Sequence, residues 1–135
     1  MIRNIILLLV ITSTFYSYSQ NNKYDPINTG VNMTIAIMSV DSLCLAGDTI
    51  LALYTDNGFL KYGGQTIWSG SRVAIAIWGD DTTSEEKDGF LNGENIEWAV
   101  LKNDSLFSFS PKYKVGNNLW SPNGISIIDS LTYIY

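Results

Sequence analysis

Short runs of β-branched and aromatic residues recur at regular spacing along this chain, and turn signals separate them. Pairs such as Asn-Gly supply the positive φ that tight turns between strands require. Beyond the N-terminal segment, no stretch sustains the i, i+3, i+4, i+7 apolar spacing of an amphipathic helix. The pattern therefore predicts seven strands, at residues 32–40, 49–55, 59–68, 72–78, 95–102, 105–114 and 125–135.

Seven short strands with turns between them favour an all-β fold, an antiparallel β-sandwich of the immunoglobulin-like or jelly-roll-like kind. The run Val73–Trp78 is apolar on both faces, which predicts a central strand. Its small Ala74 and Ala76 would let another element pack closely. The run Asn95–Val100 alternates, so Trp98 is expected to face the core.

The N-terminal segment has the features of a secretory signal peptide. Arg3 supplies a basic start, Ile5–Ile11 is an unbroken apolar run, and Ser17-Tyr18-Ser19 precedes a cleavage site before Gln20. The apolar run is too short for a membrane-spanning helix, which needs about 20 residues. We therefore expect a secreted protein, periplasmic, cell-surface or extracellular, that is not inserted in a membrane after cleavage. Its parts would be a signal peptide at 1–19, a polar leader at 20–31 and one domain at 32–135.

Charge and side-chain inventory exclude several classes of function. Without Arg3, the chain carries seven basic and thirteen acidic residues, a net charge of −6, which argues against nucleic acid as a partner. The single cysteine, Cys44, cannot form an internal disulfide and is expected to be a buried thiol. The chain has no histidine, so zinc sites and histidine-based nucleophile triads are disfavoured.

The stretch Ile77–Glu94 carries six of the thirteen acidic residues. Two interpretations are open: a calcium site and a solvated loop between strands. The spacing does not match an EF-hand, but a loop that folds back could gather oxygen ligands for calcium. One short helical turn at Thr82–Glu86 is expected, because each threonine there precedes a glutamate by three residues. The candidate calcium ligands are Asp80, Asp81, Glu85, Glu86 and Asp88.

Exposed aromatic rings beside polar groups are typical of sugar-binding surfaces, although tryptophan also fills the cores of β-proteins. Trp120 lies in the polar segment GNNLWSPNG and is expected to be exposed. Trp78 is expected to face outward, beside Asp80. The candidate ligand-binding residues are therefore Trp78, Trp120, Trp68 and Tyr62.

The segments GDTILALYTDNG and IWSGSRVAIAIWGDDTTSEEKDGFLNGENIEW carry a recognisable pattern. They resemble an extracellular all-β module of secreted and surface proteins of Bacteroidota, over roughly residues 28–101. The most specific part is WGDD, followed by EKDGF and then GE. The resemblance implies an all-β extracellular domain. Because that module has no settled biochemical activity, it transfers no catalytic residue to this chain.

These features favour a secreted, non-catalytic binding or adhesion module for carbohydrate or a surface protein, without a cofactor unless calcium binds. An alternative is a structural or accessory protein that assembles by β-strand addition through its apolar terminal segment, residues 125–135. A third hypothesis is a carboxylate-based hydrolase. Such an enzyme needs two carboxyls about 5–10 Å apart across a cleft, and no partner for Asp80 is evident in the sequence.

Overall fold

A computed structural model describes residues 25–135, so the expected signal peptide lies outside the described residues. The described chain forms seven strands close to the expected positions, which confirms the all-β class. Between residues 25 and 135 no helix is long and apolar enough to cross a membrane. The strands are β1 (Asn32–Ile37), β2 (Thr49–Asp56), β3 (Phe59–Ile67), β4 (Val73–Trp78), β5 (Glu97–Lys102), β6 (Ser105–Val115) and β7 (Ile125–Tyr133).

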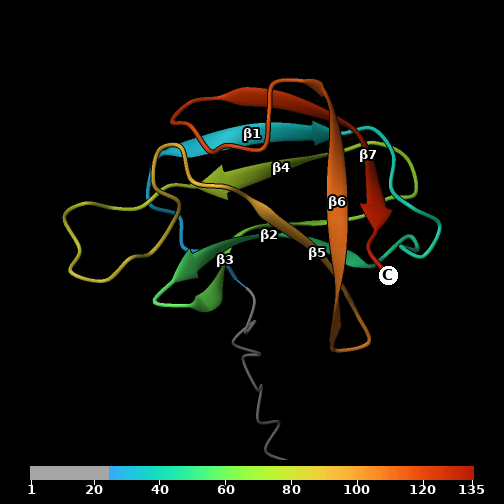
Figure 1. The fold of residues 1–135 in the computed structure, drawn as a ribbon, viewed down its shortest axis with the longest axis horizontal. Coiled ribbons are helices and arrows are strands. Elements are labelled where there is room, and N and C mark those ends of the chain that lie inside the picture. The colour runs from blue at the N-terminus through green and yellow to red at the C-terminus, as the bar shows by residue number, and fades with distance from the viewer. Residues whose placement is uncertain (1–24) are drawn as a thin grey trace, which may run out of the picture.

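The strands form one sheet in the order β3-β2-β5-β6-β7-β1-β4. The sheet curls until its two terminal strands, β3 and β4, contact each other, so the architecture is a nearly closed barrel (Figure 1). The sandwich expectation is thus approximately right in its strands and core, but the layers belong to one continuous sheet. The antiparallel expectation needs one correction, because β1 and β7 pair in parallel. The apolar C-terminal segment is therefore a strand inside the sheet, between β6 and β1.

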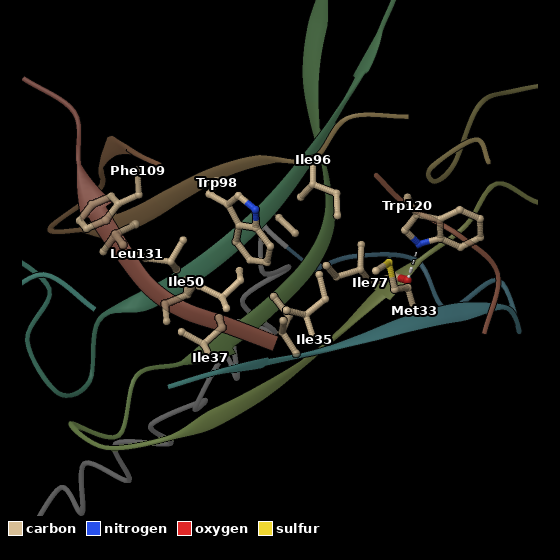
Figure 2. Close-up of a cluster of buried hydrophobic side chains, with 14 of the residues drawn as sticks. Met33, Ile35, Ile37, Ile50, Ile77, Ile96, Trp98, Phe109, Trp120 and Leu131 are labelled. Carbon is tan, nitrogen blue, oxygen red and sulfur yellow. Dashed lines mark hydrogen bonds between the residues drawn. The ribbon is translucent and has the colours of Figure 1, made fainter. Parts of the chain in front are cut away.

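The core fills the inside of this curled sheet (Figure 2). Side chains alternate between the faces of each strand, so Ile75 and Ile77 of β4 point inward, and so does Trp98 of β5. All three are buried, as the alternation predicts. Buried side chains from the other strands include Met33, Ile35, Ile37, Ile50, Phe109, Ile128 and Leu131.

The contact between β3 and β4 depends on Gly63 and Gly64. A register shift in the β2–β3 pairing leaves Gly63 without a partner in the ladder. A Cβ atom on Gly64 would lie 2.7 Å from the carbonyl oxygen of Ala76 in β4, so only glycine allows this approach. A Cβ atom on Gly63 would collide with the ring of Phe90. The sheet is therefore closed by backbone contact and an inserted ring. The expectation that Val73–Trp78 is a central strand is wrong, because β4 is a terminal strand of the sheet.

The end of the leader joins the two terminal strands from outside. The Gln65 side chain of β3 donates to Asp25 (2.7 Å). Close to the end of β4, the Gly79 N–H donates to the Val31 carbonyl (2.9 Å), and the Thr29 hydroxyl donates to the Gly79 carbonyl. Residues 25–31 thus reach from β3 to the end of β4 and reinforce the closure.

Replacing Gly64 with valine is expected to destabilise the protein, because the added atoms meet a backbone oxygen that cannot rotate away. Overpacking of this kind costs about 1–3 kcal/mol. Ile67→Thr, at an exposed position of the same strand, should change the free energy of unfolding by less than about 0.5 kcal/mol. Urea unfolding of both variants measures the difference, and equal midpoints would contradict the role assigned to Gly64.

Candidate functional site

The acidic loop, residues 79–94, folds back onto the end of β4. The Phe90 N–H donates to the Trp78 carbonyl (3.0 Å), and the Asp80 N–H donates to the Phe90 carbonyl (2.9 Å). Gly79 and Gly89 lie so close that a Cβ atom on Gly89 would collide with the Gly79 backbone. The loop therefore extends the sheet by one residue pair, Gly79 and Phe90, beyond β4, and it places the Phe90 ring against Gly63.

Three aspartates hold this loop by accepting hydrogen bonds. Asp80 accepts from the backbone N–H of Asp88 (2.9 Å), and Asp88 accepts from the backbone N–H of Asp81 (2.7 Å). Asp81 accepts from the hydroxyl and the N–H of Thr83 (2.7 and 2.9 Å). These two bonds from Thr83 lower the pKa of Asp81 below its usual value. The carboxylates thus satisfy backbone donors of the loop itself.

A lysine–glutamate pair fastens the loop to β2. The Lys87 ammonium contacts both oxygens of Glu94 (2.8 and 2.7 Å) and donates to the Thr55 carbonyl (2.7 Å). Glu94 also accepts from the N–H groups of Thr55 (3.2 Å) and Leu91 (3.0 Å). The ammonium lies 5.3 Å from the centre of the Tyr54 ring. Burial, followed by the nearby acidic charges, raises the pKa of Tyr54 to about 12.

The structure does not assemble the expected calcium ligands. Among residues 25–135, no group of three or more Asp, Glu, Cys or His side chains is arranged to hold a metal ion. The side chains of Glu85 and Glu86 are exposed. The helical turn expected at Thr82–Glu86 is wrong, because the segment forms turns and bends. The Asp81 carboxylate accepts a hydrogen bond from the Thr83 N–H. Such local bonds from a side chain to the backbone compete with the backbone hydrogen bonds of a helix.

The expected exposed aromatic patch does not form. Trp120 is only 4% exposed, and its ring nitrogen donates to the Ile77 carbonyl at 2.9 Å (Figure 2). Its ring packs against Gly79, where a Cβ atom would collide with it. Trp68 is 6% exposed. The expected exposure of Trp120 is therefore wrong, because its polar loop folds over the end of β4.

The other two aromatic candidates are partly accessible and lie in different surroundings. Trp78 is half-buried at the end of β4. Tyr62 is half-buried on the outer side of the sheet, against the small cluster of Leu51, Leu53 and Ala99. Neither residue forms a stacking surface together with Trp68 and Trp120, because those two rings are buried.

A groove of about 490 Å³ lies at the opposite end of β4 from the acidic loop. Its walls are residues 38–46 of the β1–β2 loop and residues 68–72 of the β3–β4 loop. The two loops lie at the same end of the barrel (Figure 1). Binding sites for small ligands typically measure about 300–1,000 Å³. The lining residues are Met38, Ser39, Val40, Ser42, Cys44, Leu45, Ala46, Trp68, Gly70, Ser71 and Arg72.

Backbone and side-chain hydrogen bonds fix the groove walls. The Gly47 N–H donates to the Trp68 carbonyl (2.8 Å), and the Trp68 N–H donates to the Asp48 carbonyl (2.8 Å). The Lys102 ammonium donates to the Leu43 carbonyl (3.0 Å) and contacts the Asp48 carboxylate (3.2 Å). The walls are therefore held in place, which limits the entropy that a ligand must remove on binding.

Cys44 contributes a buried, neutral thiol to the groove wall. Burial raises its pKa to about 11, the Asp48 carboxylate adds to this effect, and the Lys102 ammonium opposes it. The sequence expectation of a buried thiol is confirmed. With this pKa, Cys44 is poorly suited to act as a nucleophile at neutral pH.

Comparisons with known proteins add little to this geometry. No family model and no curated protein matches the chain. A solved structure described as an alternative pilotin from the type II secretion system of Vibrio cholerae is similar at 6% sequence identity, with a TM-score of 0.37. The match covers 77% of this chain and 96% of the pilotin. At that TM-score the likeness supports no inference about function.

Removing the Asp88 carboxylate is expected to loosen the acidic loop. In Asp88→Ala, the half-buried N–H of Asp81 loses its acceptor, which should cost about 1–3 kcal/mol of unfolding free energy. Glu85→Ala removes the same charge from an exposed position of the same loop and should cost less than about 0.5 kcal/mol. Chemical denaturation compares the two, and equal losses would show that the effect is one of net charge alone.

The Cys44 thiol is expected to contribute stability that disappears in alkali. Its pKa is raised from 9.0 in the unfolded chain to about 11 in the fold. The contribution is therefore complete below pH 9 and is lost as the pH rises to about 11. The difference in unfolding free energy between the wild type and Cys44→Ala, measured from pH 7 to 11, should shrink across that window. A constant difference would contradict the raised pKa.

Proposed function

We propose that this protein is a secreted, non-catalytic binding module whose ligand, a carbohydrate, occupies the groove between residues 38–46 and 68–72. The observation that carries the proposal is a groove of ligand size whose walls are already fixed by hydrogen bonds. Secretion rests on the N-terminal sequence pattern, and an extracellular role agrees with the resemblance to the Bacteroidota module.

The acidic loop is the weaker candidate for a ligand site. The carboxylates of Asp80, Asp81 and Asp88 accept backbone hydrogen bonds, and Glu94 binds Lys87. A ligand or catalytic role for these groups would compete with the bonds that hold Phe90 in place. The groove has less of this competition: the Ser39 hydroxyl donates to the Asp129 carbonyl (2.7 Å), but Ser42, Leu45 and Ser71 on its walls are exposed.

Strand addition has less support in this arrangement. The apolar terminal segment proposed for it is β7, which already pairs on both sides. The terminal strands of the sheet are β3 and β4, and they contact each other.

The proposal is tested by screening the secreted protein against neutral and acidic oligosaccharides and mapping any binding by amide chemical shifts. We expect shifts at Ser42, Ala46 and Ser71. Ser71→Trp should fill the groove and weaken binding at least about tenfold, about 1.4 kcal/mol, whereas Ser110→Trp, at an exposed position of β6 outside the groove, should leave it unchanged. Absence of binding to every oligosaccharide, or shifts confined to residues 79–94, would overturn the proposal.

A further inference from the structure

Arg72 is a cation at the rim of the groove that forms no ion pair within the part of the chain that the structure describes. The three ion pairs of the described chain use Lys61, Lys87 and Lys102. Arg72 takes part in none of them, and its side chain is exposed at the groove rim. Among positions 25–135, the Arg72 guanidinium donates no hydrogen bond, and the backbone carbonyl of Arg72 accepts one from the Ser69 hydroxyl (3.4 Å). The guanidinium is therefore available to a ligand.

The acidic groups beside the groove are occupied by other donors. Asp41 accepts from the N–H groups of Leu43 (3.1 Å) and Tyr133 (3.3 Å). Asp48 accepts from the N–H of Leu45 (2.8 Å) and pairs with Lys102. Neither carboxylate forms an ion pair with Arg72, so an anionic ligand can bind the guanidinium without displacing a partner from it.

Apolar side chains and serine hydroxyls line the rest of the groove. Met38, Val40 and Leu45 supply apolar surface, while Ser42 and Ser71 supply hydroxyl groups. A sugar ring presents C–H groups to apolar surface and hydroxyl groups to polar surface, so both kinds of lining suit it. A guanidinium binds a carboxylate through two parallel hydrogen bonds, which an ammonium does not provide.

We propose that the ligand is an acidic oligosaccharide, whose uronate carboxylate pairs with the Arg72 guanidinium while the sugar ring lies along the apolar wall of the groove. This inference rests on the proposed function and specifies its ligand class. It also explains how a chain with an overall negative charge would bind an anion: the recognition is local, through one unpaired arginine.

The test uses calorimetric titration of the secreted protein with oligomers of galacturonate, glucuronate and mannuronate. The comparison ligands are neutral oligomers of the matching hexoses, sulfated neutral oligomers, and sulfate ion alone. We expect at least one uronate oligomer to bind about tenfold tighter than its neutral counterpart. Arg72→Gln should abolish that preference, and Arg72→Lys should restore it only in part. Lys114→Gln makes the same change of charge near the far end of β6 and should leave the preference intact.

The outcomes separate the two proposals. Equal binding of neutral and uronate oligomers in the groove would keep the proposed function and overturn the acidic-sugar assignment. A uronate preference that survives in Arg72→Gln, or a preference for sulfated over uronate oligomers, would overturn the assignment as well. Failure of all oligosaccharides to bind would overturn both.

Discussion

The fold depends on how its two terminal strands meet. When a seven-stranded sheet curls on itself, its terminal strands β3 and β4 must pack against each other. Here no hydrogen-bonded ladder joins these two strands. Gly64 lets the two backbones touch at Ala76, and Gly63 leaves room for the ring of Phe90. Both glycines are buried, so a side chain at Gly64 would push β3 away from β4, and one at Gly63 would displace the Phe90 ring. Closure also protects two strand edges that would otherwise be open to pairing with other chains.

The acidic loop is best understood as part of this closure. Its aspartates and Glu94 accept backbone hydrogen bonds, and these bonds fix the path of the chain from β4 to Phe90. The stretch that carries the resemblance, from WGDD to KDGF and GE, thus contains the carboxylates whose hydrogen bonds hold the loop. Ligand recognition is then assigned to the groove at the other end of β4, where the walls are fixed and Ser42, Ser71 and Arg72 are exposed.

The sequence predicted those features that depend on local patterns. The seven strands and the inward positions of Ile75, Ile77 and Trp98 follow from alternation and turn residues, which act over a few positions. The parallel pairing of β1 with β7 joins segments about 90 residues apart, so no local signal reports it. Polar neighbours suggested that Trp120 is exposed, but its burial is set by a distant strand end. The groove also escaped prediction, because its two walls come from separate loops without a shared motif.

Native-state hydrogen exchange of the amides in residues 79–94 tests the closure most directly. If the loop belongs to the fold, the N–H groups of Asp81, Asp88 and Phe90, which donate to Asp88, Asp80 and Trp78, should be protected about as well as those of β4. The amide of Glu85, in the exposed turn of the same loop, should exchange rapidly and serves as the internal control. Rapid exchange of all four amides would contradict the account, because the loop would then open independently of the sheet it is said to close.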